Sequence, residues 1–255
     1  MNFAQEYIVI TGASGKIGKS LANEFAKKGA NLILLDHPNA SKSNSDLAQY
    51  LDNKYNGDTL SYNLDITNSQ EIKECFYHLQ SKIPRIDVLI NNAGINAFLP
   101  AVQITEEVWD QIIDVNLKGA FFVSQQVSSW MISQKKGVII NIASQHGIVG
   151  NSNRAPYCAS KAGLINLSRA LSYEWAKYQI RVNTISPTFV HDINDELNHN
   201  HLNSSQSKRE FLSKIPLRKY ATPIDVANAA VYLSSNMAQM ITGHNLVVDG
   251  GWTAI

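Results

Sequence analysis

Short runs of apolar residues alternate with helix-like stretches along the whole chain. The runs are rich in Ile, Leu and Val and do not alternate polar with apolar residues, which is typical of parallel strands that crossover helices bury on both faces. We expect seven strands, at residues 7–11, 31–35, 60–64, 88–90, 138–142, 182–185 and 246–248. Helices are expected at residues 18–28, 68–82, 105–132, 157–177 and 223–235. The pattern predicts a doubly wound α/β fold, a parallel sheet with helices on both faces.

The length of the chain limits how many such units it can contain. With 255 residues it lies near the upper limit for a single hydrophobic core, so one large domain or two small ones are possible. No internal repeat and no Pro- or Ser-rich linker interrupts the pattern, which continues to the last residues. We therefore expect a single domain over residues 1–255.

Charge, cysteines and hydropathy argue against several classes of protein. The chain has 22 basic and 21 acidic residues, so no bulk field would gather a nucleic acid. Cys75 and Cys158 are too few for a disulfide framework and lack the spacing of metal ligands. No signal peptide is apparent, and the apolar runs are far too short to span a membrane. We expect a cytoplasmic protein with no nucleic-acid partner and no membrane partner.

Residues 189–214 differ from the rest of the chain. They hold three of the seven histidines, several Asn and Ser residues and only scattered apolar ones. Loops of this length inside compact domains are often lids, so we expect a substrate loop or lid here. His199 and His201, with the nearby Asp195 and Glu196, could ligate a metal, but the pattern is more typical of a solvated loop. No metal site is predicted.

The first expected strand leads into the sequence TGASGKIG, residues 11–18, and then into a helix. Glycines in such a turn let the backbone approach a pyrophosphate, and the helix N-terminus supplies N–H groups and a positive dipole end. Asp36 follows the second strand at 24 residues after Gly12, where a carboxylate can bind the adenosine ribose and repel a 2′-phosphate. Lys16 could pair with a phosphate, although a surface lysine explains it as well. The region predicts a dinucleotide site that favours NAD over NADP.

Tyr157 and Lys161 are spaced i,i+4, which places both side chains on one face of a helix. An ammonium near a phenol stabilises the phenolate and lowers the tyrosine pKa from about 10 toward working pH. Tyrosine can then act as general acid in ketone reduction or as general base in alcohol oxidation. Taken alone, such a pair is more often structural than catalytic.

Several motifs occur in a definite order along nearly the whole chain. They are TGASGKIG at 11–18, LDIT at 64–67, NNAG at 91–94, Asn116 in DVNLKG, Ser144, YCASK at 157–161 and VDGG at 248–251. In this order and spacing the chain resembles the short-chain dehydrogenase/reductase family, in its compact single-domain branch. The resemblance implies a Rossmann-type fold, NAD(P)-dependent oxidation and reduction of CH–OH groups, and a homotetramer formed through helices 105–132 and 157–177 and the C-terminal strand.

The resemblance also implies roles for particular residues. Asn116 would support a water that relays protons, Ser144 would hydrogen-bond the substrate oxygen, and Tyr157 would be the acid/base group. Lys161 would also hold the nicotinamide ribose, and hydride would pass directly between the substrate carbon and the cofactor. The expected cofactor-binding residues are Gly12, Ser14, Gly15, Lys16, Ile17, Gly18, Asp36, Asp65, Ile66, Asn91, Asn92, Ala93, Gly94, Tyr157, Lys161, Pro187 and Val190.

The chain departs from the family pattern in its glycine loop. Glycines fall at 12, 15 and 18, which gives TGxxGxxG where the compact branch usually has TGxxxGxG. This spacing is more typical of the extended branch, which includes nucleotide-sugar epimerases. Those enzymes carry a longer C-terminal domain, for which the 70 residues after Ile185 are too few.

A second departure follows the strand that ends at Ile185. The family often has Pro-Gly there and a threonine that touches the nicotinamide carboxamide, whereas this chain has Pro187, Thr188 and Asp192. Ionised aspartate cannot donate a hydrogen bond, so the backbone of Val190 would have to serve instead.

The residues expected to face the substrate are polar. Ser144, His146, Arg154 and Tyr157 form the candidate set, together with Gln145, Asn151 and the loop from His191 onward. Such a lining suits a small-molecule sugar, sugar acid or polyol better than a steroid. The ending VDGGWTAI also resembles sugar-acid dehydrogenases of the family.

Three alternatives stay open. A 3-oxoacyl-(acyl-carrier-protein) reductase would share every catalytic residue but usually prefers NADPH, through a basic group near the position of Asp36. A nucleotide-sugar epimerase would need tightly retained NAD and a larger substrate domain. A non-catalytic NAD-sensing regulator would have no need of Ser144, Tyr157 and Lys161 together.

Overall fold

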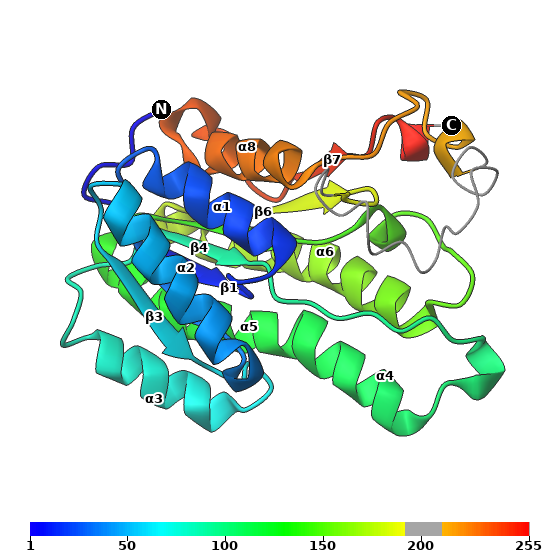
Figure 1. The fold of residues 1–255 in the computed structure, drawn as a ribbon, viewed down its shortest axis with the longest axis horizontal. Coiled ribbons are helices and arrows are strands. Elements are labelled where there is room, and N and C mark those ends of the chain that lie inside the picture. Colours follow the sequence, from blue (N-terminus) through cyan, green and yellow to red (C-terminus); the bar gives the residue numbers. More distant parts are fainter. Residues whose placement is uncertain (192–210, 255) are drawn as a thin grey trace.

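The computed structural model describes residues 1–191 and 211–254, and its centre is a seven-stranded parallel sheet. The strands lie in the order β3-β2-β1-β4-β5-β6-β7 (Figure 1). Their bounds are β1 Tyr7–Thr11, β2 Asn31–Asp36, β3 Thr59–Asn63, β4 Val88–Asn91, β5 Gly137–Ile142, β6 Ile180–Pro187 and β7 Asn245–Val248. The predicted Rossmann-type α/β fold is confirmed, and each expected strand is found within a few residues of its expected bounds.

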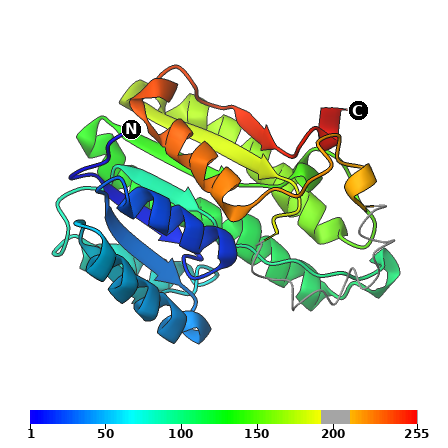
Figure 2. The same cartoon turned by 45° about the horizontal axis from the view of Figure 1, so that its top comes forward.

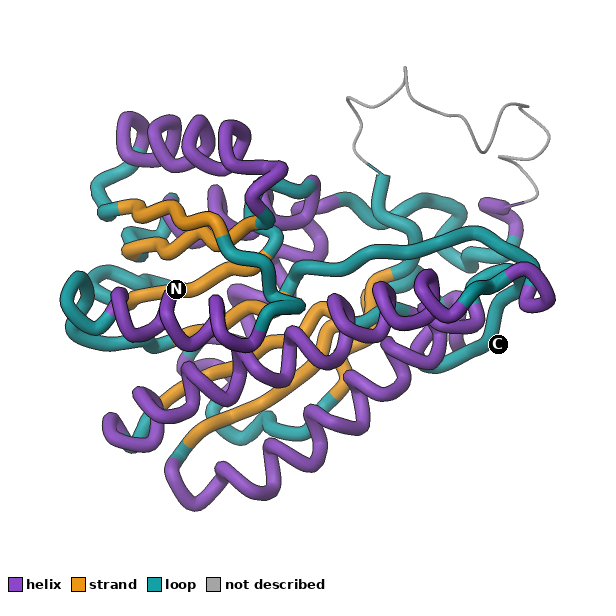
Figure 3. The backbone as a smooth tube through the Cα atoms, turned by 90° about the horizontal axis from the view of Figure 1, so that it is seen from below, coloured by secondary structure: helices purple, strands orange, loops and turns teal. Residues whose placement is uncertain are grey.

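Helices cover both faces of this sheet. In Figures 2 and 3 the strands lie between the two layers of helices. One face carries α1 (Lys16–Ala26), α2 (Ser41–Lys54) and α8 (Pro223–Ser234), and the other carries α3 (Ser69–Leu79), α5 (Ala120–Gln134) and α6 (Ala155–Trp175). Side chains alternate between these layers, so Ile8 and Ile10 pack in the first and Val9 in the second. The described residues contain no helix long and apolar enough to cross a membrane.

Helix α2 was not expected from the sequence. Of its 14 residues, the apolar ones that are buried are Leu47, Ala48 and Leu51. They pack into the same core layer as α1, and the buried amide of Asn44 donates to Leu34 O at 3.0 Å. A helix so polar in composition is stabilised mainly by this packing, which a local apolar pattern does not reveal.

The expected helix over residues 105–132 is divided into two. Helix α4 (Glu106–Ile113) leads into a π-helical segment, Asp114–Gly119, and the chain then continues as α5. Single π turns inside helices often occur at functional sites. Here the segment carries Asn116, one of the candidate catalytic residues.

The outermost strand also differs from expectation. Strand β3 pairs with β2 alone, and residues 59–62 are half-buried while Asn63 is exposed. The sequence pattern had indicated a strand buried on both faces. At the edge of the sheet, fewer neighbouring elements cover it.

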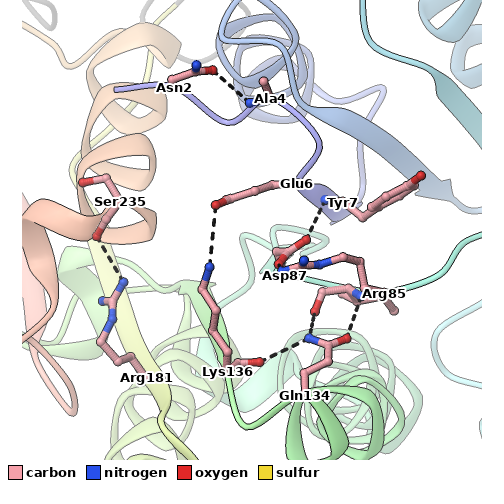
Figure 4. Close-up of polar contacts among 11 residues, drawn as sticks. Asn2, Ala4, Glu6, Tyr7, Arg85, Asp87, Gln134, Lys136, Arg181 and Ser235 are labelled. Atoms are coloured by element: carbon pink, nitrogen blue, oxygen red, sulfur yellow. Dashed lines mark hydrogen bonds and ion pairs between the residues drawn. The ribbon is translucent and has the colours of Figure 1, made fainter.

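Polar side chains tie together the amino ends of β1 and β4, far from their carboxyl ends (Figure 4). Asp87 accepts a hydrogen bond from Tyr7 N at 3.0 Å and pairs with Arg85. Gln134, at the end of α5, accepts from Ile86 N at 3.0 Å and donates to Ile86 O at 2.7 Å. These contacts hold the chain where it enters the two central strands.

The order of the strands creates a crevice beside β1. Strand β1 pairs with β2 on one side and β4 on the other, so the chain winds in opposite directions from this point. In open α/β sheets, ligands bind beyond the carboxyl ends of the strands at such a switch point. The glycine loop follows β1 directly, and residues 92–94 follow β4.

Candidate active site

The glycine loop is held in close contact with the segment after β4. Gly12 has φ +61°, and a Cβ built on it would lie 2.8 Å from Ala93 Cα. Asn92 donates from its amide to Thr11 O at 3.1 Å and to Gly12 O at 2.9 Å. Behind the loop, a Cβ on Gly18 would lie 2.2 Å from Gly12 O, so Gly18 lets α1 pack directly under the loop.

Helix α1 begins at this loop without a capping side chain. Its N-cap residue is Gly15, which is exposed and in an extended conformation. The first N–H groups of a helix have no intrahelical partners, and together with the helix dipole they favour an anion. The loop thus presents an anion-binding end to the crevice.

Asp36 lies at the carboxyl end of β2 and is anchored to the glycine loop. Its Oδ2 accepts from Ser14 N and from Ser14 Oγ, both at 2.7 Å, and its Oδ1 accepts from His37 N at 2.8 Å. The carboxylate is half-buried in the crevice wall. Asp36 therefore shapes the loop as well as carrying charge into the crevice.

The crevice is a groove of about 740 Å³ over the carboxyl ends of β1, β2 and β4. Asp65 is fixed in its wall, because its Oδ1 accepts from Thr67 N at 2.9 Å and from Thr67 Oγ1 at 2.8 Å. Of the expected cofactor residues, the groove brings together Gly12, Ser14, Gly15, Lys16, Ile17, Asp36, Asp65, Ile66, Asn92, Ala93, Gly94 and Val190. Sequence reasoning did not identify Gln111 and Val115, which line it from α4 and the π-helical segment.

Asn91 does not line this groove. Its side chain is 3% exposed and donates to Asn141 Oδ1 at 2.7 Å and to Ser124 Oγ at 2.8 Å. It therefore joins β4 to β5 and α5 within the core and does not have the cofactor-lining position expected from the motif.

A second cavity, of about 340 Å³, adjoins the groove and contains the candidate catalytic side chains. Ser144 reaches it from the end of β5, and Tyr157 and Lys161 reach it from the first turns of α6. Pro187, at the end of β6, lies in the same wall. The two cavities share five lining residues, which are Ile17, Asn92, Gly94, Ile95 and Val190. A molecule that fills the groove can therefore meet one that occupies the second cavity.

Asn116 stands behind the cavity wall and does not line it. It is fully buried, accepts from Ile95 N at 2.8 Å, and donates to Ile95 O at 2.9 Å and to Ser160 Oγ at 3.1 Å. Its amide thus joins the segment after β4 to α6. A Cβ on Gly94 would lie 3.3 Å from both Asn116 Oδ1 and Lys161 Nζ, so the glycine leaves room for the two groups.

Lys161 is 4% exposed, and its ammonium donates to Ile142 O at 2.8 Å. Its Nζ lies 5.8 Å from the centroid of the Tyr157 ring. Burial lowers the pKa of Lys161 to about 8. The amine therefore exchanges protons much nearer neutrality than an ordinary lysine.

The pKa of Tyr157 is raised and not lowered as the sequence pattern had indicated. Desolvation in the cavity wall is the largest cause, and it outweighs the hydrogen bond with Ser144 and the positive charge of Arg154, which act in the opposite direction. Lys161 is not among the groups that lower the pKa of Tyr157, and its ammonium donates to Ile142 O. The prediction was wrong for this arrangement of the side chains.

Ser144 also has a local structural role. Its Oγ accepts from His146 N at 3.1 Å and caps the short helix Gln145–Gly147. Both the cap and the catalytic interpretation of this residue are therefore compatible with the structure, since the hydroxyl that caps also faces the cavity.

On the substrate side, the cavity gathers Gln145, His146 and Arg154 beside Tyr157. Burial, and then the charge of Arg154, lower the pKa of His146 to about 4, so this imidazole is neutral at pH 7. Asn151 does not face the cavity and instead approaches His146 Nε2 at 3.4 Å.

Aromatic side chains form a wall that sequence reasoning missed. Phe98 and Phe189 line the cavity, and Phe211 packs edge-on against Phe189 with 4.3 Å between ring centroids. Trp252 adds a ring 5.2 Å from Phe211. Phe98 and Phe189 lie in irregular segments, and Phe211 and Trp252 lie in short helical turns, so no periodic pattern marks these residues.

Part of the expected lid lies outside the described residues. Asp192, Asp195, Glu196, His199 and His201 all belong to that part. On its near side, Val190 bridges to Ala221, and His191 N donates to Ala221 O at 2.9 Å. Thr188 is buried, with its N–H donating to Val248 O at 3.1 Å. Among the described residues, no three or more His, Cys, Asp or Glu side chains are grouped to hold a metal.

Comparison with known proteins gives consistent similarities over nearly the full length. A family model described as enoyl-(acyl carrier protein) reductase matches residues 12–253. An NAD-dependent glycerol dehydrogenase of Listeria innocua is 36% identical over 252 residues, covering 99% of this chain and 95% of that protein. The 3-oxoacyl-[acyl-carrier-protein] reductase FabG of Rickettsia felis is 39% identical over 244 residues, covering 95% of each. A crystal structure of a short chain dehydrogenase from Bacillus anthracis matches with a TM-score of 0.86 at 28% identity, covering 97% of this chain and 96% of that one.

Proposed function

This chain belongs to the short-chain dehydrogenase/reductase family of oxidoreductases that act on CH–OH groups, and we propose that it interconverts a secondary alcohol and a ketone with NAD. The substrate would be polar, such as a sugar, a sugar acid or a polyol. One observation carries the proposal: Ser144, Tyr157 and Lys161 line a cavity that shares its wall with a dinucleotide-sized groove.

The groove has the features that a dinucleotide requires. Gly12 and Gly15 present backbone close to the groove, and the uncapped end of α1 favours a pyrophosphate. Asp36 would bind the adenosine ribose, and its hydrogen bonds with Ser14 would hold the carboxylate in the groove, where it would repel a 2′-phosphate. This favours NAD over NADP, in line with the name of the Listeria innocua relative. The cofactor, when bound, would accept or supply the hydride at the reacting carbon.

The protein side of the reaction is proton transfer and positioning. The Ser144 hydroxyl would hydrogen-bond the substrate oxygen, and the Tyr157 hydroxyl would give a proton to a ketone. In the reverse reaction the Tyr157 phenolate would take the proton from an alcohol, and the raised pKa of Tyr157 disfavours that form. Lys161 would contact the nicotinamide ribose and exchange protons with solvent, for which a pKa of about 8 is suited. Asn116 would position Ile95 and α6 around these groups through its three hydrogen bonds.

A 3-oxoacyl-(acyl-carrier-protein) reductase is the second candidate function. The FabG protein of Rickettsia felis is 39% identical to this chain, slightly more than the glycerol dehydrogenase. The negative charge of Asp36 in the groove argues against the NADPH preference expected of this alternative. Comparing initial rates with NADH and NADPH on a 3-oxoacyl thioester, and on a polar ketone, separates the two candidates.

The experiment that tests the proposed function is a screen of polyols and sugar acids with NAD, following NADH by its near-ultraviolet absorbance. Tyr157→Phe should lower kcat on any substrate found by about 10²- to 10⁴-fold, because the acid/base group is removed. Tyr77→Phe is a control, because Tyr77 is 78% exposed on α3, away from the cavity. Unchanged turnover by Tyr157→Phe would refute the mechanism, and NAD binding without turnover of any alcohol, ketone or thioester would favour a regulator.

A further inference from the structure

Arg154 enters the second cavity beside the acid/base tyrosine. It is the N-cap residue of α6 and precedes Tyr157 by three positions, so the two side chains leave the first turn on the same side. Both line the cavity together with Ser144. A group bound to Arg154 would therefore belong to the same small molecule whose oxygen reaches Ser144 and Tyr157.

The guanidinium is held in place by aromatic rings. Its Cζ lies 4.1 Å from the ring centroid of Phe98 and 5.0 Å from that of Phe189. Stacking on rings orients the guanidinium plane while leaving its edge free to donate hydrogen bonds. Phe98 follows β4 and Phe189 follows β6, so two segments far apart in the chain fix one side chain.

No anionic side chain of the described residues neutralises Arg154. Its Nε is buried and has no hydrogen-bond partner among them, and no Asp or Glu occurs in the described lining of the cavity. Burial lowers the pKa of Arg154 from its usual value, the direction expected of a desolvated cation. Arg154 as a whole is half-buried. A partly desolvated charge without an anionic partner among the described residues is unfavourable, and a bound anion would reduce that penalty.

The other basic groups of the cavity are not equivalent to Arg154. Lys161 already donates to Ile142 O at 2.8 Å and stands on the side shared with the groove. His146 is neutral, as its lowered pKa of about 4 indicates. The cavity therefore combines one oriented guanidinium with neutral polar groups, among them the amide of Gln145, whose Nε2 and Oε1 are buried and have no partner among the described residues.

We propose that Arg154 binds a carboxylate of the substrate and that the enzyme therefore acts on hydroxy acids and their oxo acids, such as sugar acids, in preference to neutral polyols. The planar guanidinium matches a carboxylate with two parallel hydrogen bonds, whereas a neutral alcohol would leave it unpaired. Gln145 and His146 then serve the hydroxyl groups between the carboxylate and the reacting carbon. This inference rests on the proposed function, since it specifies the substrate class of the same site.

Matched pairs of acids and alcohols provide the kinetic test. Glycerate is compared with glycerol, and 3-hydroxybutyrate with 1,3-butanediol, each with NAD as oxidant. We expect the wild-type protein to prefer the acid of each pair, and Arg154→Gln to lower kcat/KM for the acid by about 10- to 100-fold, mainly through KM. The ratio of kcat/KM for the acid to kcat/KM for the matched alcohol should fall by the same factor, because the effect of the Arg154 charge on Tyr157 is lost with both substrates and cancels in the ratio. Arg154→Lys should recover part of the loss. Arg169→Gln, an exposed arginine of the same helix, is the control and should change neither substrate.

A binding readout makes the inference independent of turnover. Phenylglyoxal modifies accessible arginines, and peptide mapping by mass spectrometry reports on Arg154 alone. Glycerate and 3-hydroxybutyrate should protect Arg154 in the wild-type protein and in Tyr157→Phe, whereas glycerol and 1,3-butanediol should not. Equal protection by acids and alcohols, or none by the acids, would overturn the proposal.

The outcomes distinguish a failure of the proposed function from a failure of the carboxylate inference. If Tyr157→Phe keeps its turnover, the proposed function fails, while the protection of Arg154 still reports on carboxylate binding. If Tyr157→Phe is inactive but Arg154→Gln keeps the acid preference, the carboxylate inference alone fails. A preference for 3-oxoacyl thioesters that Arg154→Gln leaves unchanged would also overturn it.

Discussion

Two glycines of the motif after β1, Gly15 at the N-cap of α1 and Gly18 in its first turn, constrain the site in different ways. A Cβ on Gly18 would lie 2.2 Å from Gly12 O and 2.6 Å from Ala13 O, and these backbone atoms cannot move without distorting the loop. A Cβ on Gly15 would meet only Gly12 O, at 3.3 Å, and Gly15 has φ −69°, which any residue adopts. Glycine is thus required by close packing at position 18 and is not required by packing or by φ at position 15.

We expect Gly18→Ala to reduce the free energy of unfolding by about 1–3 kcal/mol, because the added methyl group overpacks the contact between α1 and the loop. Its affinity for NADH should fall as well, since the displaced backbone forms the groove. Gly15→Ala should change stability by less than about 0.5 kcal/mol. Urea denaturation and fluorescence titration with NADH measure both effects, and similar stability losses in the two variants would contradict the packing argument.

His146 makes stability depend on pH in a defined direction. Burial lowers its pKa from 6.5 to about 4 in the folded protein, so between these values the unfolded chain binds more protons. The contribution of the neutral imidazole is fully present above pH 6.5 and is lost as the pH falls toward 4. We expect the loss to be up to about 3 kcal/mol, as 1.4 kcal/mol per pKa unit implies.

Urea denaturation of the wild-type protein and of His146→Gln at pH 7, 5 and 4 isolates this contribution. The variant should lose less stability than the wild type on acidification, because glutamine does not titrate, and carboxylates elsewhere affect both proteins alike. Parallel curves for the two proteins would show that His146 is not held neutral by the fold.

At the scale of elements, the two ends of the sheet serve different purposes. The carboxyl ends of the strands carry the groove and the cavity, while the amino ends of β1 and β4 are joined by the contacts of Asp87 with Tyr7 and Arg85 (Figure 4). Asp87 is 3% exposed, so its removal leaves buried polar groups without partners. The separation predicts that stability and activity can be changed independently.

We expect Asp87→Ala to reduce the free energy of unfolding by about 1–3 kcal/mol, the usual effect of leaving a buried donor unpaired. The KM values for NAD and substrate should not change, because the site lies at the opposite ends of the strands. Lys136→Met removes only the ion pair with Glu6, whose atoms are 3.9 Å apart near the surface, and should change stability by less than about 1 kcal/mol. A large KM effect in Asp87→Ala would contradict this division.

The π-helical segment shows how an element can be decided by its surroundings. Residues 105–132 have a pattern compatible with one continuous helix, yet the chain is α4, a π-helical segment and α5. Within that segment, Asn116 reaches Ile95 and Ser160, which belong to two other parts of the chain. These hydrogen bonds are tertiary, so local sequence carries no sign of the break.

At the scale of the whole molecule, several large apolar side chains remain exposed. Trp109 on α4 is 41% exposed, Tyr173 on α6 is 90% exposed, and Val247 on β7 is 37% exposed. In the described sheet, β7 pairs only with β6 and leaves an edge open. These residues lie in the elements through which the resemblance implies assembly, and exposed apolar groups and open edges favour association.

We predict that the protein is a tetramer in solution, with four times the chain mass of 28.2 kDa by size-exclusion chromatography with light scattering. Tyr173→Lys should shift the population to smaller species, because a charge would be buried in the expected interface. Tyr77→Lys, at a residue 78% exposed on α3 outside these elements, should leave the mass unchanged. A wild-type monomer would show that these side chains are merely exposed.

The amino-acid sequence by itself determined the order of strands and helices and the chemical groups of the site. Buried parallel strands are recognisable as short apolar runs, and the placement of Tyr157 and Lys161 on one face of a helix follows from helical spacing alone. The glycine loop and Asp36 were found in the same way, because each follows a recognisable strand. Helix α2 was not predicted from the sequence, because its only buried apolar residues are Leu47, Ala48 and Leu51. The helix depends on the packing of these side chains in the core layer that also holds α1.

Only the tertiary structure decided which side chains are in contact and in which direction their pKa values shift. The rings of Phe98 and Phe189 meet at Arg154 from separate loops. Lys161 donates to Ile142 O and is not among the groups that lower the pKa of Tyr157. Burial and electrostatic interactions sum over every neighbour in space, whatever its distance along the chain. Motif spacing therefore predicted candidate groups of the site, while the packing of the whole molecule decided which of them meet and which further side chains, such as Phe98 and Phe189, line the cavity.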